Sequence, residues 1–485
     1  MHYPWWYVHS LTSPMLIALV ATLHIFASLY AVGGGLFLAE EVGYAYKVGN
    51  KDLLTYLHSH TFFFILLTVV YGAITGVGIW WTIGLASPLA TESLIHIFVF
   101  GWAMEYVFFV LEVVSAFIFF YYWGKLKPEV HTKIGWIYGI SAYMSLVLIT
   151  AITSFQLDIG TWTPGQSMWI AFFNPQTFPQ IIARSGASLL LASLYVYLHA
   201  AFKLKNNKQL LALVETRAAR WSMAGAVLVT IGGVWWLLNL PESAKASLAG
   251  ASALIILTAL IFAATVVVFL MLYFGSYRRP GWVNQGFAIL YFIVGIAATS
   301  TGEFIREGVR KPYIIYNFVT GNNVLVSEIP KLQQTGYLNG GTWTRAFMKA
   351  HYPQVVDSSG NVDSPKLLSL PESDQLAVGR VLFQYHCNDC HSAEGFSAVA
   401  ELTRGWSEDM IQTVVTHLDK AHFFMPPWCG TREEAMLLTK YLEHISLASP
   451  AGMDFSGKET QSKSALAQFG LAGSSPSPQN RGIEK

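Results

Sequence analysis

The sequence predicts an all-α fold: a polytopic membrane helix bundle of about eight spans with both termini outside, followed by a small helical domain. Three observations lead to this prediction. The chain of 485 residues is 53% hydrophobic and only 12% charged, which is typical of a membrane protein. Its apolar stretches are long and regularly spaced as far as residue 305, and a more polar segment with helical patterning follows.

Eight apolar stretches reach the length of about 20 residues that a helix needs to cross a bilayer. They lie at roughly 14–39, 60–84, 92–123, 134–156, 179–202, 219–240, 248–275 and 283–305. We assign them to one domain, residues 1–312. The segment "MHYPWWYVHSLTSP" lacks the cationic region of a cleaved signal peptide, so we predict that its Trp and Tyr residues form an interfacial anchor before an uncleaved span.

Lysine and arginine in the connections predict the orientation of the spans. The first, third, fifth and seventh connections each carry two or more of these residues, whereas the sixth has only Lys245 and the second and fourth have none. Because Lys and Arg concentrate on the cytoplasmic side, both termini are expected outside. We predict a multi-pass protein of a bacterial or archaeal cytoplasmic membrane, with its final domain on the periplasmic side.

The part of the chain after the last span divides into a periplasmic connector (313–371), a helical domain (372–448) and a flexible tail (449–485) rich in Ser, Gly and Pro. The helical domain contains "FQYHCNDCHSAEG", a c-type haem attachment signal. Cys387 and Cys390 would form the thioether bonds, and His391 would bind the iron. An accidental match or a zinc-binding pair is the alternative. The third cysteine, Cys429, has no evident partner, so no disulfide framework is implied.

A second ligand for this haem is expected in "HFFMPPWCGTREEAMLLTKYLEHI", where Met425 precedes a Pro-Pro turn and a closing amphipathic helix. The stretch resembles the distal methionine loop of class I cytochromes c. A His/Met pair leaves no open iron position and suits electron transfer. Met425 as core packing, or His422 as the ligand, are the alternatives.

Ionisable residues inside the spans indicate a functional site, because burying them in a bilayer is costly. His24 lies in the first span, and Glu105 and Glu112 lie two helical turns apart on one face of the third. Glu307 and Arg310 lie at the outer end of the eighth span. We expect His24, Glu105 and Glu307 to approach each other in the outer half of the bundle, forming a haem-binding site with a proton path.

Simpler explanations exist for several of these groups. His24 could be an ordinary core histidine, and Glu303 with Arg306 a solvated rim. His58, His60 and His199 are expected at the solvated cytoplasmic ends of spans. His131 is expected in a hydrated loop, and we assign it no role. Glu92 and His96 are expected within the third span.

On these residues the sequence resembles subunit I of the cytochrome bd family over about residues 1–318. "MLIALVATLHIFASLYAVGGGLFLAEEVGY" looks like the family's first helix, with His24 at its high-spin haem ligand. "VVYGAITGVGIWW" and "AMEYVFFVLEVVSAFIFFYYW" resemble its second and third helices, which puts Glu112, and Glu105 with a one-residue gap, at glutamates of haem ligation and proton delivery. "REGVRKPYII" resembles E-x-G-R-Q-P-W, with Glu307 at a haem-associated glutamate and Arg310 matching.

The departures from this family concern its electron input. The histidine that binds the low-spin haem b falls at Ala183 or Arg184, and "SALIILTALIF" lacks the corresponding methionine. Only "PESAKAS" stands where the family has its quinol-binding loop, and a final span is replaced by the haem-bearing domain. The resemblance therefore implies that the low-spin haem and the quinol site are lost, and Arg184 could pair with a haem propionate or a glutamate.

Two hypotheses follow. The first is a bd-like cytochrome c oxidase in which electrons pass between a periplasmic carrier, the tethered c-haem and the membrane haems, where dioxygen is reduced. The second is a non-catalytic electron-transfer subunit that links the quinone pool or membrane haems to a larger periplasmic complex, with His58, His60 and His96 as spare ligands. A haem-based sensor or inert anchor is a third option. The expected cofactors are one covalent c-type haem and two non-covalent haems, b-type or d-type. The expected partners are lipid, a second bd-like membrane subunit or other respiratory subunits, and the carrier, but no nucleic acid.

Overall fold

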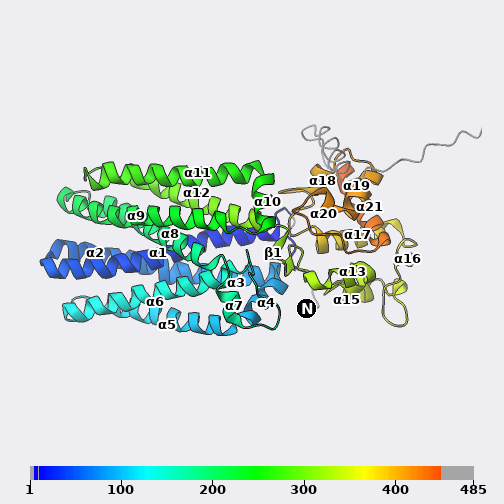
Figure 1. Cartoon of the computed structure of the whole chain (residues 1–485), viewed down its shortest axis with the longest axis horizontal. Coiled ribbons are helices and arrows are strands. Elements are labelled where there is room, and N and C mark those ends of the chain that lie inside the picture. The colour runs from blue at the N-terminus through cyan, green and yellow to red at the C-terminus, as the bar shows by residue number, and fades with distance from the viewer. Residues whose placement is uncertain (1–4, 9, 449–485) are drawn as a thin grey trace, which may run out of the picture. The chain divides into compact units, whose positions relative to one another are not determined.

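The computed structural model describes residues 5–8 and 10–448, which form two compact units (Figure 1). One unit is Ser13–Val326, and the other combines the described residues before Ser13 with those from Ser327 onward. The structure therefore divides the chain at Val326 and Ser327, whereas the sequence suggested a division after Pro312. The predicted flexible tail, 449–485, lies outside the described residues.

The first unit, Ser13–Val326, contains the eight predicted spans, and the multi-pass helical fold is confirmed. The spans are α1 (Ser13–Val48), α2–η1–α3 (Lys51–Ile65, Leu66–Tyr71, Gly72–Ala86), α5 (Val99–Tyr121), α6 (Pro128–Ser154), α8 (Thr177–Lys203), α9 (Lys208–Leu238), α11–η2 (Ser252–Met271, Leu272–Tyr277) and α12 (Gln285–Arg310). The elements between and after them are α4 (Pro88–Ile97), α7 (Met168–Phe172), α10 (Glu242–Gly250), β1 (Tyr313–Ile315) and β2 (Val319–Thr320).

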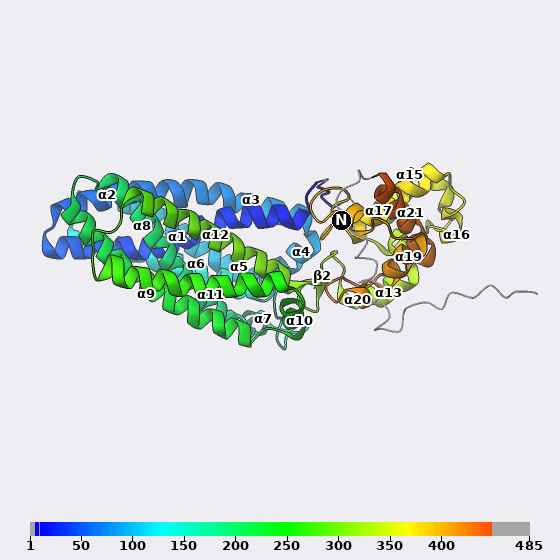
Figure 2. The same ribbon diagram turned by 90° about the horizontal axis from the view of Figure 1, so that it is seen from above.

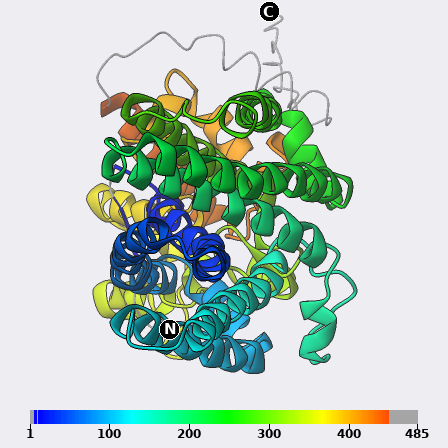
Figure 3. The same ribbon diagram turned by 90° about the vertical axis from the view of Figure 1, so that its left-hand side faces the viewer.

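Helix α1 is the central element of this unit. It packs against α2, α3, α6, α8 and α12. Figure 1 shows α1 and α2 between the pair α5–α6 and the group α8, α9, α11 and α12, and the end-on view in Figure 3 shows the same blue helices between the green and the cyan ones. Most side chains from Phe26 to Ala45 are therefore packed among helices, whereas Leu19 and Leu23 nearer the start of α1 are exposed.

Glycine lets α8 and α9 approach each other closely along their length. A Cβ added at Gly186 would lie 2.5 Å from the carbonyl oxygen of Gly225, and one at Gly225 would lie 2.6 Å from that of Gly186. These distances are too short for any larger residue, as is usual where small residues bring membrane helices together. Figure 2 shows α8, α9 and α11 from a second direction.

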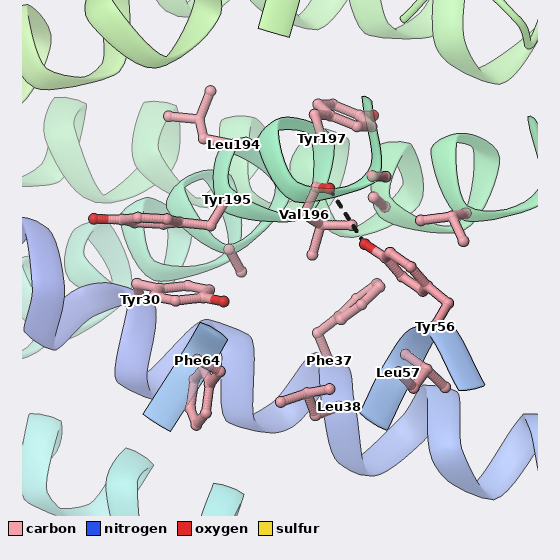
Figure 4. Packing of buried hydrophobic residues seen from close by; sticks show 14 of the residues in the cluster. Tyr30, Phe37, Leu38, Tyr56, Leu57, Phe64, Leu194, Tyr195, Val196 and Tyr197 are labelled. Atoms are coloured by element: carbon pink, nitrogen blue, oxygen red, sulfur yellow. Dashed lines mark hydrogen bonds between the residues drawn. The ribbon is translucent and has the colours of Figure 1, made fainter. Parts of the chain in front are cut away.

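The largest core cluster of the bundle is aromatic, as Figure 4 shows. Tyr30 stacks on Tyr195 with 3.9 Å between ring centroids, and Phe64 meets Tyr30 edge-on at 5.1 Å. The Tyr56 hydroxyl donates a hydrogen bond to the Val196 carbonyl oxygen (3.4 Å). Stacked and edge-to-face aromatic pairs add to the energy of area burial, so this cluster fixes α1 and α2 against α8.

The second unit is a small helical assembly. Its elements after η3 (Val326–Glu328), which straddles the division, are α13 (Ile329–Thr335), α14 (Tyr337–Gly340), α15 (Thr344–His351), η4 (Pro353–Val355), α16 (Ser364–Leu367), α17 (Glu372–His386), α18 (Val399–Leu402), α19 (Glu408–Thr416), α20 (Leu418–Ala421) and α21 (Arg432–Ala448).

Helices α17 and α21 form the centre of this unit. They cross at Gly379, where an added Cβ would lie 2.4 Å from the Leu437 carbonyl oxygen, and the rings of Phe383 and Tyr441 pack beside the crossing at 5.7 Å. The residues from 327 to 371 are part of this unit rather than a separate connector, because Tyr337 and Trp343 are buried in its core.

The residues before α1 also belong to the second unit. Trp5 is buried, stacks on Tyr385 at 4.5 Å, and meets Trp343 edge-on at 6.4 Å. The Phe396 amide donates a hydrogen bond to the Ser10 carbonyl oxygen (2.9 Å). The prediction of an interfacial anchor is therefore wrong for Trp5, which finds an aromatic protein pocket instead.

Two predicted local placements are also wrong. Glu92 and His96 lie on the separate helix α4, where both are exposed, and not inside the third span. His131 is buried in the first turn of α6, where its Nδ1 lies 2.9 Å from the Tyr46 hydroxyl and its ring stacks on Phe119. The sequence showed only a charged stretch before the fourth span, because the surrounding aromatic residues come from α1 and α5.

Candidate functional site

His24 on α1 is held by α3. Its Nδ1 lies 3.2 Å from the Thr75 hydroxyl, and a Cβ added at Gly76 would lie 3.1 Å from its Cε1. The Thr75 hydroxyl proton is directed at the Tyr71 carbonyl oxygen (2.9 Å), so the hydroxyl oxygen accepts from Nδ1–H. This arrangement leaves Nε2 as the nitrogen that can bind a metal.

Glu105 and Glu112 both face α6, as their spacing predicts. The Ser145 hydroxyl donates to Glu105 Oε1 (2.7 Å), and the Tyr138 hydroxyl donates to Glu112 Oε1 (3.1 Å). Glu112 lies seven residues after Glu105 on α5, and its partner Tyr138 lies seven residues before Ser145 on α6. This opposite order is expected for antiparallel neighbours. The Tyr138 hydroxyl also lies 3.1 Å from the Ala31 carbonyl oxygen, which connects Glu112 to α1.

Glu307 is ion-paired at the end of α12. It contacts Arg310, and its Oε1 lies 3.1 Å from Lys311 Nζ. Arg310 is 9% exposed, and its Nε is buried with no hydrogen-bond partner among the described residues. An unsatisfied buried guanidinium donor fits an anionic acceptor such as a haem propionate.

Arg184 on α8 forms its hydrogen bonds with α6 and interacts electrostatically with Glu303 of α12 without a direct ion pair among the described residues. Its Nη1 donates to the Thr150 and Thr153 hydroxyls (3.3 and 3.1 Å). The Glu303 carboxylate is instead paired with Arg306 (2.8 Å), and Glu303 is only 8% exposed, so this pair is more buried than a solvated rim would be.

The predicted membrane site is thus distributed over three helices. No hydrogen bond or ion pair within residues 13–326 joins His24, Glu105, Glu112 and Glu307 to one another. Each has its own protein partner. A group as large as haem could contact several of them at once, and the structure supports such a site only through the orientation of His24 and the unsatisfied Arg310 donor.

The haem attachment sequence forms the turn after α17. His391 Nδ1 lies 3.1 Å from the Ser397 carbonyl oxygen. A carbonyl oxygen only accepts, so Nδ1 carries the proton, and Nε2 is the nitrogen that would bind iron in a c-type site. The three cysteines, all described, form no disulfide, and Cys387 and Cys390 therefore keep the sulfur atoms that thioether attachment needs.

Met425 follows a turn in which its amide donates to the His422 carbonyl oxygen (2.9 Å). Phe423 and Phe424 beside it are 45% and 40% exposed, and Phe396 in the turn after His391 is 47% exposed. Apolar rings that flank both expected iron ligands fit a porphyrin, which would cover them. The residues present therefore fit a c-type haem.

Several residues behind this turn were not expected from the sequence. The Tyr337 hydroxyl accepts from the Cys429 amide (3.2 Å) and lies 2.5 Å from Nδ1 of the buried His386. Burial lowers the pKa of His386 to about 3, so its imidazole stays neutral in this hydrogen bond with Tyr337. Tyr337 lies in the stretch interpreted as a connector, and its contacts with His386 and Cys429 span too many residues for a sequence pattern to reveal them.

Glu434 on α21 was also missed. It is fully buried and accepts hydrogen bonds from the amides of Tyr337 (2.8 Å), Leu338 (2.8 Å) and Thr431 (3.0 Å). Burial raises its pKa to about 7, and the three amide donors oppose that rise. The Glu434 carboxylate therefore accepts from backbone amides at the amino-terminal ends of both α14 and α21.

The remaining histidines differ from the expectation of solvated span ends. His58 is exposed, as expected, and stacks on Phe120. His60 is completely buried, and His199 lies beside it with 4.9 Å between ring centroids. Among the described residues there is no cluster of three or more His, Cys, Asp or Glu side chains able to hold a metal ion.

Comparison with known proteins bears on the bundle. No family model matches the chain, and no curated protein matches it. Among solved structures, the chain is similar to the bd oxidase from Geobacillus thermodenitrificans, with a TM-score of 0.50 and 17% identity over 62% of this chain and 87% of that one. The likeness establishes a bd oxidase-like helical membrane fold.

Proposed function

We propose that this chain is a membrane-bound respiratory oxidoreductase subunit that passes electrons between a periplasmic carrier, a c-haem at Cys387, Cys390 and His391, and haems in the bundle. Its proposed reaction is that of a bd-like cytochrome c oxidase, with dioxygen as the acceptor. One observation carries the proposal. His24 Nδ1 lies against the Thr75 hydroxyl and His391 Nδ1 against the Ser397 carbonyl oxygen, so Nε2 is the nitrogen that each ring would offer to a haem iron.

The residues have separate roles in this proposal. His391 and Met425 would hold the c-haem iron, and His24 would hold a membrane haem, with Glu307 and Arg310 at its edge. Haem iron, when bound, supplies one-electron transfer and, at an open axial position, dioxygen chemistry. Glu105 and Glu112 would hold protons, which Ser145 and Tyr138 orient through their hydroxyl groups.

The proposed setting is the cytoplasmic membrane of a bacterium or archaeon, with the second unit on the periplasmic side. That side is where c-haem attachment takes place, and it agrees with the Lys and Arg bias of the connections. The proposed cofactors are one covalent c-haem and two b-type or d-type haems. A second membrane subunit and a periplasmic electron carrier are the proposed partners.

A second candidate is the non-catalytic electron-transfer subunit. The ion pairs of Glu307 with Arg310 and Lys311 favour it, because a carboxylate neutralised by two cations is a poor iron ligand. In that case the membrane haems would be six-coordinate.

Carbon monoxide separates the two candidates. We would record a reduced-plus-carbon-monoxide minus reduced spectrum of the purified protein and identify the extracted haems. A shift of a haem other than the c-haem is expected for the oxidase. Low-spin b and c bands without a shift would establish the electron-transfer subunit instead, and absence of any haem would refute both.

A further inference from the structure

A buried and a partly buried imidazole from different spans lie together in the half of the bundle nearest the Lys- and Arg-rich connections. His60 is on α2 and His199 is on α8, with 4.9 Å between ring centroids. His60 is 0% exposed. The ring of Tyr56 lies against both, at 5.8 Å from His60 and 5.4 Å from His199.

Each imidazole has one nitrogen without a hydrogen bond. Nδ1 of His60 and Nδ1 of His199 are both buried and have no partner among the described residues. Leaving a polar atom unsatisfied in a bundle core costs stability, and ionisable side chains inside a span usually serve transport. Since no third His, Cys, Asp or Glu joins the described pair, a proton suits it better than a metal ion.

The other nitrogen of His60 is connected to α1. The Tyr30 hydroxyl lies 3.1 Å from His60 Nε2. An imidazole can take up a proton at Nδ1 and release a different one from Nε2, so one proton enters and one leaves without a change in its charge. Tyr30 can accept that proton on its hydroxyl oxygen and release its own hydroxyl proton.

Tyr138 continues the connection on the other side of α1. Tyr30 and Tyr138 interact electrostatically, and both rings pack edge-on against Phe64, at 5.1 and 5.4 Å. A cavity of about 10 Å³ borders Phe64 and Tyr138 and is also lined by Thr61, whereas Tyr30 does not line it. That volume is about that of one water molecule, and the two hydroxyl groups supply polar partners. Tyr138 in turn donates to Glu112.

Charged groups surround the opposite side of the pair. Lys203 on α8 interacts electrostatically with His199, and Glu41 on α1 interacts with Tyr56. Glu41 is 1% exposed and is ion-paired with Arg217 of α9. Tyr195 is the further titratable neighbour, stacked on Tyr30. These groups offer a polar entry from the Lys- and Arg-rich end of the bundle.

We infer that His60 and His199 form a proton-holding site that takes protons from the Lys- and Arg-rich side and delivers them to Glu112 through Tyr30 and Tyr138. The inference deepens the proposed function, since it supplies protons to the carboxylates of the bundle. It requires only that haem reduction takes up protons, and holds for either candidate function.

Proton uptake on haem reduction tests this site. The purified full-length protein would be reduced rapidly in weakly buffered solution with a pH-indicator dye, and the rate of proton uptake followed beside the haem spectrum. Tyr30→Phe keeps the ring and removes the hydroxyl, so we expect uptake about 100-fold slower with unchanged haem bands. His60→Gln and His199→Gln should give the same result. His58→Gln, which changes an exposed histidine on the same helix, should behave as wild type.

Three outcomes would overturn the inference: unchanged uptake in Tyr30→Phe and both histidine variants, no proton uptake by the wild-type protein, or loss of a haem band in a histidine variant, which would identify that histidine as a ligand. A carbon monoxide shift with unaltered uptake would leave the oxidase proposal standing and refute only the proton site. Slowed uptake without a carbon monoxide shift would refute the oxidase and retain the site.

Discussion

At the scale of single residues, hydroxyl groups orient the charged side chains of the bundle. Thr75, Ser145 and Tyr138 each contact one of the predicted site residues, His24, Glu105 and Glu112. Each hydroxyl comes from a neighbouring helix rather than from the helix it serves. The site residues could be predicted because an ionisable side chain inside a span costs free energy and is usually functional. Their hydroxyl partners could not be predicted, because pairing depends on the register between helices.

Thr75 gives the most direct test of this orientation. Thr75→Val keeps the shape of the side chain and removes the hydroxyl, so His24 loses its Nδ1 acceptor. We expect membrane haem to be bound about 10- to 100-fold more weakly, as for other residues that orient metal-binding histidines. Haem content and the visible spectrum measure this, and Thr75→Ser should retain both. A Val variant with full haem content would contradict the role of Thr75.

Glu434 predicts a pH dependence for the second unit. Its pKa rises from an ordinary 4.5 to about 7 on burial, so the folded unit binds the proton more tightly than the unfolded chain. The resulting stabilisation is complete below pH 4.5 and is lost as the pH rises to about 7, by at most about 3 kcal/mol. Hydrogen exchange of α21 amides in the full-length protein, corrected for intrinsic rates, should therefore show less protection at pH 7.5 than at pH 5.

The control for this prediction is the neighbouring carboxylate. Glu434→Gln should remove most of the pH dependence, because the amide cannot titrate. Glu433→Gln should leave most of it, since Glu433 is only partly buried and its charge is the smallest of the causes that shift the pKa of Glu434. An equal pH dependence in wild type and Glu434→Gln would assign it to other groups.

At the scale of elements, the spans could be predicted because apolar length is a local property. The first predicted span, 14–39, and the observed α1, Ser13–Val48, differ mainly at the carboxyl end. What failed was the position of polar residues near span ends. His60 and His131 were expected to be solvated, yet both are buried, because aromatic rings of other helices cover them: Tyr30 and Phe37 of α1 lie against His60, and Phe119 of α5 stacks on His131.

Two glycines should differ in how well they tolerate alanine: Gly186 in the contact of α8 with α9, and Gly302 on α12. Gly186→Ala places a Cβ against backbone atoms of α9, which cannot move aside cheaply, so we expect destabilisation of about 1–3 kcal/mol. Gly302→Ala on α12 meets nothing within 4 Å and should be neutral or stabilising by up to about 1 kcal/mol. Thermal unfolding in one detergent compares them, and equal midpoints would refute the packing argument.

At the scale of the whole molecule, the second unit combines residues that precede the bundle in the sequence with residues that follow it. The sequence predicted its α17–α21 core from the haem attachment motif and the amphipathic pattern. It could not predict Trp5 as part of that core, since an aromatic-rich stretch before a span is equally typical of an interfacial anchor. Only the contacts with Trp343 and Tyr385 distinguish these alternatives.

Trp5 should therefore contribute to the stability of this unit. Trp5→Ala removes a buried ring stacked on Tyr385, and large-to-small changes of this kind cost about 3–5 kcal/mol. Hydrogen exchange of α17 and the c-haem absorption of the purified protein would both report the loss. Leu447→Ala, at an 80% exposed position of the same unit, is the matched control. An anchor in the membrane interface would instead leave α17 exchange unchanged.

The contact of Trp5 and Ser10 with residues beyond the bundle also constrains the order of assembly. These residues leave the ribosome before the eight described spans, and Trp343, Tyr385 and Phe396 leave it after them. The aromatic pocket can form only after translation has passed those positions. The segment with Trp5 and Ser10 therefore lacks its partners while the bundle is being inserted. A ribosome that stalls within the spans would leave a hydrophobic Trp-rich segment without its pocket, available to chaperones and proteases.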